Sequence, residues 1–202
     1  MVHVLTRLTV SVSSGQDGAV IAPLRPGDLI FGFGDTKTSK PIIGFQRHCG
    51  YQPDAADASH VAVYCGEGRI VHAVSPKVVE EGLLPYFAGR RVALATWDLP
   101  GSTGNRSRKA TEIVSHMRRN VGQRYDSLAV VTSALAVLGR KRNVGGREAK
   151  RLRQPLVCST LVSDAFFLAF GEGSPLFHPQ ITDKAGFTLP AYLFCQPGLR
   201  DP

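Results

Sequence analysis

Residues 58–74 read ASHVAVYCGEGRIVHAV, and two histidines, His60 and His72, stand on either side of a glycine-containing turn. Apolar and polar residues alternate before and after the turn, which is typical of two half-buried antiparallel strands. We expect a three-residue loop, Gly66-Glu67-Gly68, in which Gly68 takes the left-handed conformation that glycine adopts without strain. The stretch therefore predicts a β-hairpin.

The length of the loop decides whether the two imidazoles meet. With three loop residues, Val63 pairs with Val71, and His60 and His72 become diagonal neighbours on one face. A two-residue loop would place them on opposite faces, because a shift of one residue turns a strand over. On this evidence alone the histidines could be incidental, half of a metal site, or half of an active site.

The remaining segments favour an α+β fold class. A Pro-Gly turn and a short apolar strand lie within residues 24–34, and a short helix and a long loop follow over 35–58. Residues 90–100 alternate as a further strand. Helical spacing is found in three later segments, which are 107–126, 127–139 and 157–171. Strands that precede helices are typical of α+β rather than of alternating α/β proteins.

Length and composition restrict the classes of protein. The 202 residues suit one domain, 1–202, of which the polar residues 1–20 are expected to be loosely ordered. There is no apolar run of about 18 residues and no signal-peptide pattern. The four cysteines have neither zinc-site nor disulfide-framework spacing. We expect reduced thiols, no metal, no cofactor and a cytoplasmic location, with signal-independent export as an open alternative.

Cys158 is the candidate nucleophile. It stands in PLVCSTLVSDAFF, where Pro155 precedes it and apolar residues then recur with helical spacing. A cysteine in the first turn of a helix is close to free backbone N–H groups, which stabilise a thiolate and an oxyanion. A nearby imidazole could then exchange protons with the thiol and with a leaving group. The alternative is a small buried core residue, which is common for free cysteine.

Together these motifs resemble the NlpC/p60 superfamily of papain-like cysteine hydrolases. The resemblance rests on RPGDLIFGF, SHVAVYCGEGR, IVHAV and the CSTLV segment at Cys158, and it runs from Pro26 to Phe167. The histidine strands precede the cysteine helix, which resembles the circularly permuted branch that includes YiiX-like and lecithin:retinol acyltransferase-like proteins. The GQRYD segment before the cysteine fits this branch as well. Ala62, where the family often has glycine, and the long 35–58 insertion depart from the pattern.

The resemblance implies a permuted papain-like α+β fold and a catalytic triad. In it, Cys158 is the nucleophile, His60 is the general base and acid, and His72 orients His60. Tyr125 and Ser159 are implied as residues that line the site or lie near the oxyanion, and a packing role is the alternative for Tyr125. Asp28 of PGDL is expected to be a turn residue.

The implied reaction is hydrolysis through a thioester acyl-enzyme. The first substrate class is amide bonds of peptides, including cell-wall peptides. The alternative is acyl esters of lipids on anionic membranes, by hydrolysis or acyl transfer. A catalytically silent binding module, or a toxin that uses the same site, is the second alternative.

A basic segment over 140–153 suggests an anionic partner. The formal net charge of the chain is +8, and this favours contact with an anionic membrane or wall polymer. A solvated loop is the simpler interpretation, and no motif indicates specific binding of nucleic acid. The residues expected to make the contact are Arg140, Lys141, Arg142, Lys150, Arg151 and Arg153.

Overall fold

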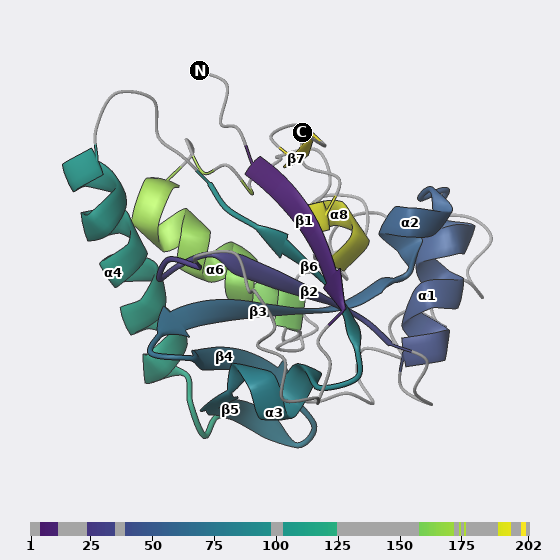
Figure 1. The fold of residues 1–202 in the computed structure, drawn as a ribbon, viewed down its shortest axis with the longest axis horizontal. Coiled ribbons are helices and arrows are strands. Elements are labelled where there is room, and N and C mark those ends of the chain that lie inside the picture. The colour runs from purple at the N-terminus through teal and green to yellow at the C-terminus, as the bar shows by residue number, and fades with distance from the viewer. Residues whose placement is uncertain are drawn as a thin grey trace, which may run out of the picture.

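The computed structural model is an α+β protein in which helices cover a largely antiparallel sheet (Figure 1). It describes residues 5–11, 24–34, 39–97, 103–124, 158–171, 174, 176, 190–194 and 199–200. In this part of the chain the strand order is β5-β4-β3-β2-β6-β1-β7. The α+β class predicted from the order of the elements is confirmed.

The strands are β1 (Leu5–Ser11), β2 (Leu29–Phe33), β3 (Ala58–Gly66), β4 (Arg69–Val74), β5 (Lys77–Gly82), β6 (Arg91–Ala95) and β7 (Leu199–Arg200). The helices are α1 (Ser39–His48), α2 (Pro53–Ala56), α3 (Leu83–Phe87), α4 (Thr103–Arg119), α6 (Cys158–Phe170) and α8 (Pro190–Phe194). The predicted strands at β2 and β6 and the predicted helices at α4 and α6 are confirmed. The predicted helix over 127–139 lies outside the described residues.

The start of the chain differs from the prediction. Residues 1–20 were expected to be loosely ordered, but Leu5–Ser11 forms β1. This strand pairs antiparallel with β6 from Arg7↔Ala95 to Ser11↔Arg91 and parallel with β7. The physical reason is the β6 edge, whose free backbone groups gain hydrogen-bond partners from the added strand.

The two faces of the sheet carry two separate apolar clusters. Alternate residues of β3, such as Val61 and Val63, point into the larger cluster, which also includes residues of α4, α6 and α8. Ala62, between them in sequence, belongs to the smaller cluster, which includes Phe87 of α3. Figure 1 shows α4 and α6 side by side at one end of the sheet and α1 and α2 at the other.

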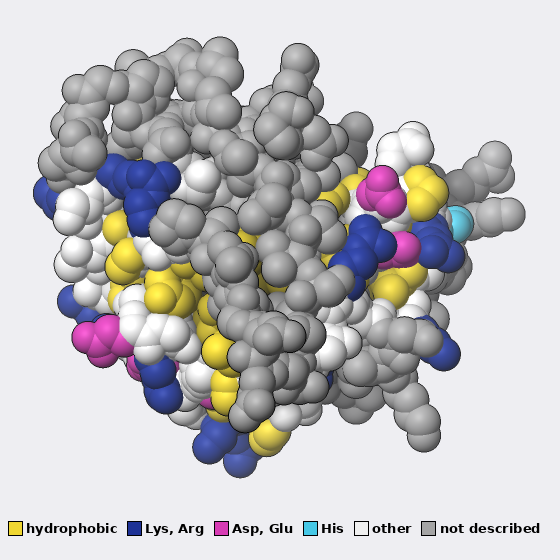
Figure 2. Space-filling view, in the orientation of Figure 1, with side chains coloured by type: hydrophobic (Ala, Val, Ile, Leu, Met, Phe, Trp, Pro, Cys, Tyr) yellow, Lys and Arg dark blue, Asp and Glu magenta, His cyan; other side chains and the backbone are white. Residues whose placement is uncertain are grey.

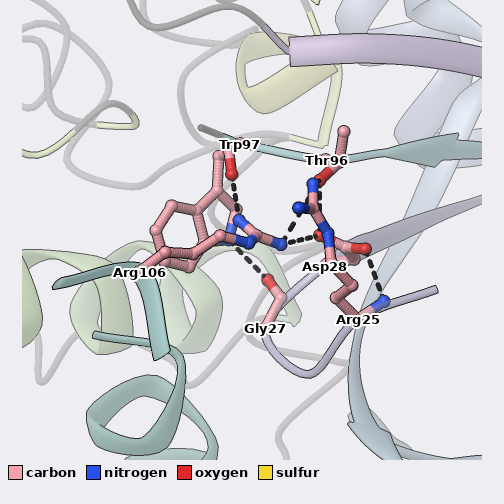
Figure 3. A network of polar contacts seen from close by, with 6 residues as sticks. All are labelled: Arg25, Gly27, Asp28, Thr96, Trp97 and Arg106. Carbon is pink, nitrogen blue, oxygen red and sulfur yellow. Dashed lines mark hydrogen bonds and ion pairs between the residues drawn. The ribbon is translucent and has the colours of Figure 1, made fainter. Parts of the chain in front are cut away.

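A buried ion pair connects the PGDL turn to α4 (Figure 3). Asp28 and Arg106 are 2% and 7% exposed, and their side chains lie 2.7 Å apart. Asp28 also accepts hydrogen bonds from the Thr96 hydroxyl and the Arg25 backbone N–H, both at 2.8 Å. The Arg106 guanidinium stacks 4.3 Å above the Trp97 ring. Asp28 is therefore a turn residue with a structural role, as the sequence predicted.

None of the helices in the described ranges is both long and apolar enough to cross a bilayer.

Candidate functional site

The hairpin of β3 and β4 has the predicted register but not the predicted loop. Val63 pairs with Val71, as expected for a three-residue loop. The turn itself has only two residues, Glu67 and Gly68, whose φ angles are 53° and 67°. Gly66 pairs with Arg69, and the register shifts between Tyr64 and Gly66. The prediction of a three-residue loop was wrong.

A bulge explains why the register survives this change. Two left-handed residues form the tight turn that matches the twist of a hairpin. A two-residue turn alone would place the two histidines on opposite faces of the hairpin. The extra residue in the β3 bulge shifts the register by one and returns them to the same face. His60 and His72 therefore share one face, as the sequence analysis required for any joint role.

The two imidazoles are in direct contact. Nε2 of His60 lies 2.8 Å from Nδ1 of His72, and their ring centroids are 5.0 Å apart. His72 is completely buried, whereas His60 is half-buried. Gly32 is the β2 partner of His60, and a Cβ there would lie 3.1 Å from Phe87 and 3.5 Å from the His60 Cβ. The absence of a side chain at Gly32 therefore makes room for the Phe87 ring beside His60.

A carboxylate completes the chain of hydrogen bonds. Nε2 of His72 lies 2.6 Å from Oε1 of Glu81, whose side chain is 39% exposed. In the β4–β5 ladder His72 pairs with Val79 and Ile70 pairs with Glu81, so His72 and Glu81 are diagonal neighbours. The chain therefore runs from His60 through buried His72 to a carboxylate that reaches solvent.

Tyr86 and Arg90 surround the pair of histidines from α3 and the turn after it. The Tyr86 ring centroid lies 4.2 Å from that of His72 and 5.8 Å from that of His60. The Arg90 guanidinium lies 4.7 Å above the Tyr86 ring. Burial raises the pKa of Tyr86, and Arg90 partly opposes that rise.

Sequence reasoning missed Glu81, Tyr86 and Arg90. The sequence contains only a weak signal for them. A second hairpin that turns near Pro76 would make Glu81 the diagonal partner of His72, and this is the one pattern that points to Glu81.

The histidines are held neutral. Burial lowers the pKa of His60 to about 3, with His72 and Arg90 acting in the same direction. Burial, followed by the charge of Arg90, lowers the pKa of His72 to about 4. Both imidazoles are therefore uncharged at neutral pH, and each has one N–H and one lone pair available.

Cys158 is the first residue of α6, as predicted, and is 2% exposed. The sequence analysis expected the helix start to favour the thiolate. Burial instead raises the pKa of the Cys158 thiol to about 11. Hydrogen bonds with the backbone of Val61, Ser159 and Cys158 itself oppose this rise but do not overcome it. The resting site therefore holds a neutral thiol, because desolvation outweighs the N–H groups of the helix start.

The thiol approaches β3 at the residue that follows His60. One of its backbone hydrogen bonds is with Val61, and a negative charge on its sulfur raises the pKa of Tyr86, which packs against both imidazoles. Cys158 belongs to the larger core, whereas Tyr86 packs against the smaller one. Within the described part of the chain, no hydrogen bond joins the Cys158 thiol to His60.

The other predicted site residues have different outcomes. Ser159 is completely buried beside Cys158, and its backbone stabilises the thiolate. Tyr125 lies outside the described residues, and so does the basic segment 140–153. On the face shown in Figure 2, the described Lys and Arg side chains stand in separate groups around the periphery.

The described residues contain no group of three or more His, Cys, Asp or Glu side chains that could hold an ion. The facing ring nitrogens of His60 and His72 are used for each other rather than for a common ligand. Of the other cysteines, Cys65 is buried and Cys49 is exposed, and both are free.

The arrangement offers a thiol beside helical N–H groups, a paired imidazole base and a carboxylate behind it. Comparison with known proteins adds no family to this description, since no family model and no curated protein matches the sequence.

Proposed function

We propose that this protein is a cysteine hydrolase of the permuted papain-like kind, which acts through a thioester acyl-enzyme. Cys158 would be the nucleophile, His60 the general base and acid, and His72 the residue that orients His60. One observation carries the proposal. Cys158, the first residue of α6, hydrogen-bonds to the backbone of Val61, the residue next to His60 of the hydrogen-bonded histidine pair, although the two segments are about 90 residues apart in sequence.

In the first half of the reaction, the Cys158 sulfur attacks the substrate carbonyl carbon while its proton passes to His60. A C–S bond forms, and the carbonyl oxygen becomes an oxyanion. The backbone N–H groups of Cys158 and Ser159, which already stabilise a thiolate, would donate to that oxygen. When the oxyanion collapses, the bond to the leaving group breaks and His60 returns its proton to that group.

In the second half, water hydrolyses the thioester. His60 takes one proton from the water as its oxygen attacks the acyl carbon. The C–S bond then breaks, and the proton returns to the Cys158 sulfur. The products are a carboxylic acid and the free thiol, so the site is restored without any other reactant.

Substrate binding has to bring the thiol and His60 into hydrogen-bond range, because that bond is absent from the described structure. Catalytic hydrogen bonds of unliganded enzymes are often long and shorten in the substrate complex. The neutral state of both groups also means that proton transfer accompanies attack, rather than preceding it as a stable thiolate–imidazolium pair.

Amide bonds of peptides, including cell-wall peptides, are our first substrate class. An amine leaves only when it is protonated, and an imidazolium with a pKa near 3 is a strong proton donor. Acyl esters of lipids are the second class. Leu84 on α3, two residues before Tyr86, is 50% exposed, and Leu168 on α6 is 66% exposed, so apolar surface is available for lipid contact.

The test compares release of products from wall peptides and from anionic phospholipid vesicles. The proteins are the unmodified chain, Cys158→Ala, His60→Ala and, as a matched control, Cys49→Ala, which removes an exposed free thiol. We expect new amino groups from the peptides, abolished by the first two changes and kept by the control. Fatty-acid release with the same dependence would favour the lipid class. Product release that survives Cys158→Ala would overturn the proposal, as would a chain that is inert to both substrates.

A further inference from the structure

We propose that Glu81 is a positioning residue that fixes the tautomers of His72 and His60, so that Nδ1 of His60 is the atom that accepts the thiol proton. This inference rests on the proposed function and adds a fourth member to the predicted set of Cys158, His60 and His72.

The bond between Glu81 and His72 determines which nitrogen of His72 carries the proton. A carboxylate oxygen accepts hydrogen bonds and has none to donate. With Oε1 of Glu81 only 2.6 Å from Nε2 of His72, the proton of this bond lies on Nε2. His72 is completely buried and has a pKa of about 4, so it is neutral at pH 7 and carries only that one ring proton. Its Nδ1 is therefore a lone pair.

The same assignment extends to His60. Nδ1 of His72, as an acceptor, needs a donor, and among the described residues the atom that lies 2.8 Å from it is Nε2 of His60. The His60 proton must then lie on Nε2. Since His60 is also neutral, its remaining lone pair is on Nδ1. The orientation of both rings is thus determined by a carboxylate that does not touch His60.

Glu81 also acts electrostatically. When the proton of Cys158 reaches Nδ1 of His60, that ring becomes an imidazolium, which burial and the charge of Arg90 both disfavour. Glu81 is the carboxylate that ends this chain of hydrogen bonds, and it stabilises the positive charge through neutral His72. Removal of the Glu81 carboxylate therefore has two effects. It leaves Nδ1 of His60 less often free to accept a proton, and it raises the free energy of the His60 imidazolium.

The chain offers a matched control on the same strand. Glu80 is the neighbour of Glu81 on β5, but it pairs with Arg118 at 2.9 Å and with Arg69 at 3.8 Å. Glu80→Gln removes one negative charge from β5, as Glu81→Ala does, without touching the histidines. Glu81→Asp keeps a carboxylate on a shorter side chain and serves as the conservative rescue.

The first readout is the tautomer itself, measured by 15N NMR of the imidazoles in the full chain at pH 7. We expect both histidines as Nε2–H tautomers in the unmodified protein, in Glu80→Gln and in Glu81→Asp. In Glu81→Ala the His72 tautomer should no longer be fixed, and its Nδ1–H form should appear. A purely structural role of Glu81 would change stability without changing these tautomers, and that result would overturn the inference.

The second readout is the rate at which p-nitrophenyl acetate acylates Cys158. We expect Glu81→Ala to lower it by about 100-fold, the lower end of the range for general acid–base catalysis. Glu81→Asp should recover most of the rate, and Glu80→Gln should leave it unchanged.

The two proposals fail in different ways. Loss of acylation in Cys158→Ala and His60→Ala, with no effect of Glu81→Ala, would overturn only the role of Glu81. Acylation that persists without Cys158 would overturn the proposed function, whereas the tautomer measurement would still stand.

Discussion

His60 stays neutral at a lower pH than a free histidine does. Burial lowers its pKa to about 3, because a charged ring is poorly solvated beside His72 and Arg90. Cys158 is shifted in the opposite sense, and its thiol stays protonated up to about pH 11. Both shifts favour neutral groups. They keep His60 and Cys158 uncharged at neutral pH, and under the proposed function proton transfer accompanies attack on the substrate.

This state predicts an unusual pH profile for acylation of Cys158 by p-nitrophenyl acetate. A base must be unprotonated to accept a proton, so activity should fall only as the pH approaches the pKa of His60. We expect a flat rate from pH 8 down to about pH 5 and a decline below that. A decline centred near pH 6.5, where a solvent-exposed histidine titrates, would contradict a buried neutral base.

Folding has to be monitored over the same range. The pKa of His60 is lower in the folded than in the unfolded chain, so the unfolded chain binds more protons between about pH 6.5 and pH 3. The contribution of neutral His60 to the free energy of unfolding is therefore fully present above pH 6.5 and is lost as the pH falls toward 3. Circular dichroism at each pH separates this loss of fold from titration of His60.

Among the elements, the β3–β4 hairpin determines whether a site exists at all. Its two-residue turn and its bulge act together, since either feature alone would move His60 and His72 to opposite faces. The turn places Glu67 at φ 53°, a conformation that strains most residues with a side chain. Gly68 occupies the same region without strain.

The turn gives a prediction about stability. Glu67→Asn should raise the free energy of unfolding by about 0.5–1 kcal/mol, because asparagine tolerates left-handed backbone better than glutamate. Gly68→Ala should lower it by about 1 kcal/mol. Urea unfolding of both variants measures these changes. A stabilising effect of Gly68→Ala would show that the turn does not have the described conformation.

For the whole molecule, the Asp28–Arg106 pair joins three parts of the fold. Asp28 directly precedes β2, Thr96 follows β6, and Arg106 comes from α4. The pair is buried, so removal of one partner leaves the other charge unpaired in the interior. The sequence analysis identified Asp28 as a turn residue but not its partner, because nothing in the pattern of α4 marks Arg106.

Arg106→Ala should lower the free energy of unfolding by about 3–5 kcal/mol. The matched control is Arg108→Ala on the same helix, which removes an exposed pair with Glu112 and should cost about 0.5 kcal/mol or less. Urea unfolding at pH 7 checks both variants. Similar effects of the two changes would contradict a structural role for the buried pair.

Local patterns in the sequence predicted much of the fold and only part of the site. The alternation around Val63 and Val71 predicted the hairpin and its register, because one face of each strand has to be buried. The length of the loop was predicted wrongly, because an extra residue in a bulge shifts the register in the same way as an extra residue in the loop. The pKa of Cys158 was expected to be lowered, since sequence shows the helix start but not the burial that outweighs it. Glu81 was missed because its contact depends on a third strand.

The central claim is that Cys158 is a nucleophile served by His60. The most direct test is intact-mass and peptide mass spectrometry of the full chain after brief exposure to p-nitrophenyl acetate at pH 7. The account predicts one acetyl group on Cys158, removable by hydroxylamine. It should be absent in Cys158→Ala, at least 100-fold slower to form in His60→Ala, and unchanged in Cys49→Ala. Acetylation on Cys49 instead of Cys158, or at an equal rate without His60, would contradict the account.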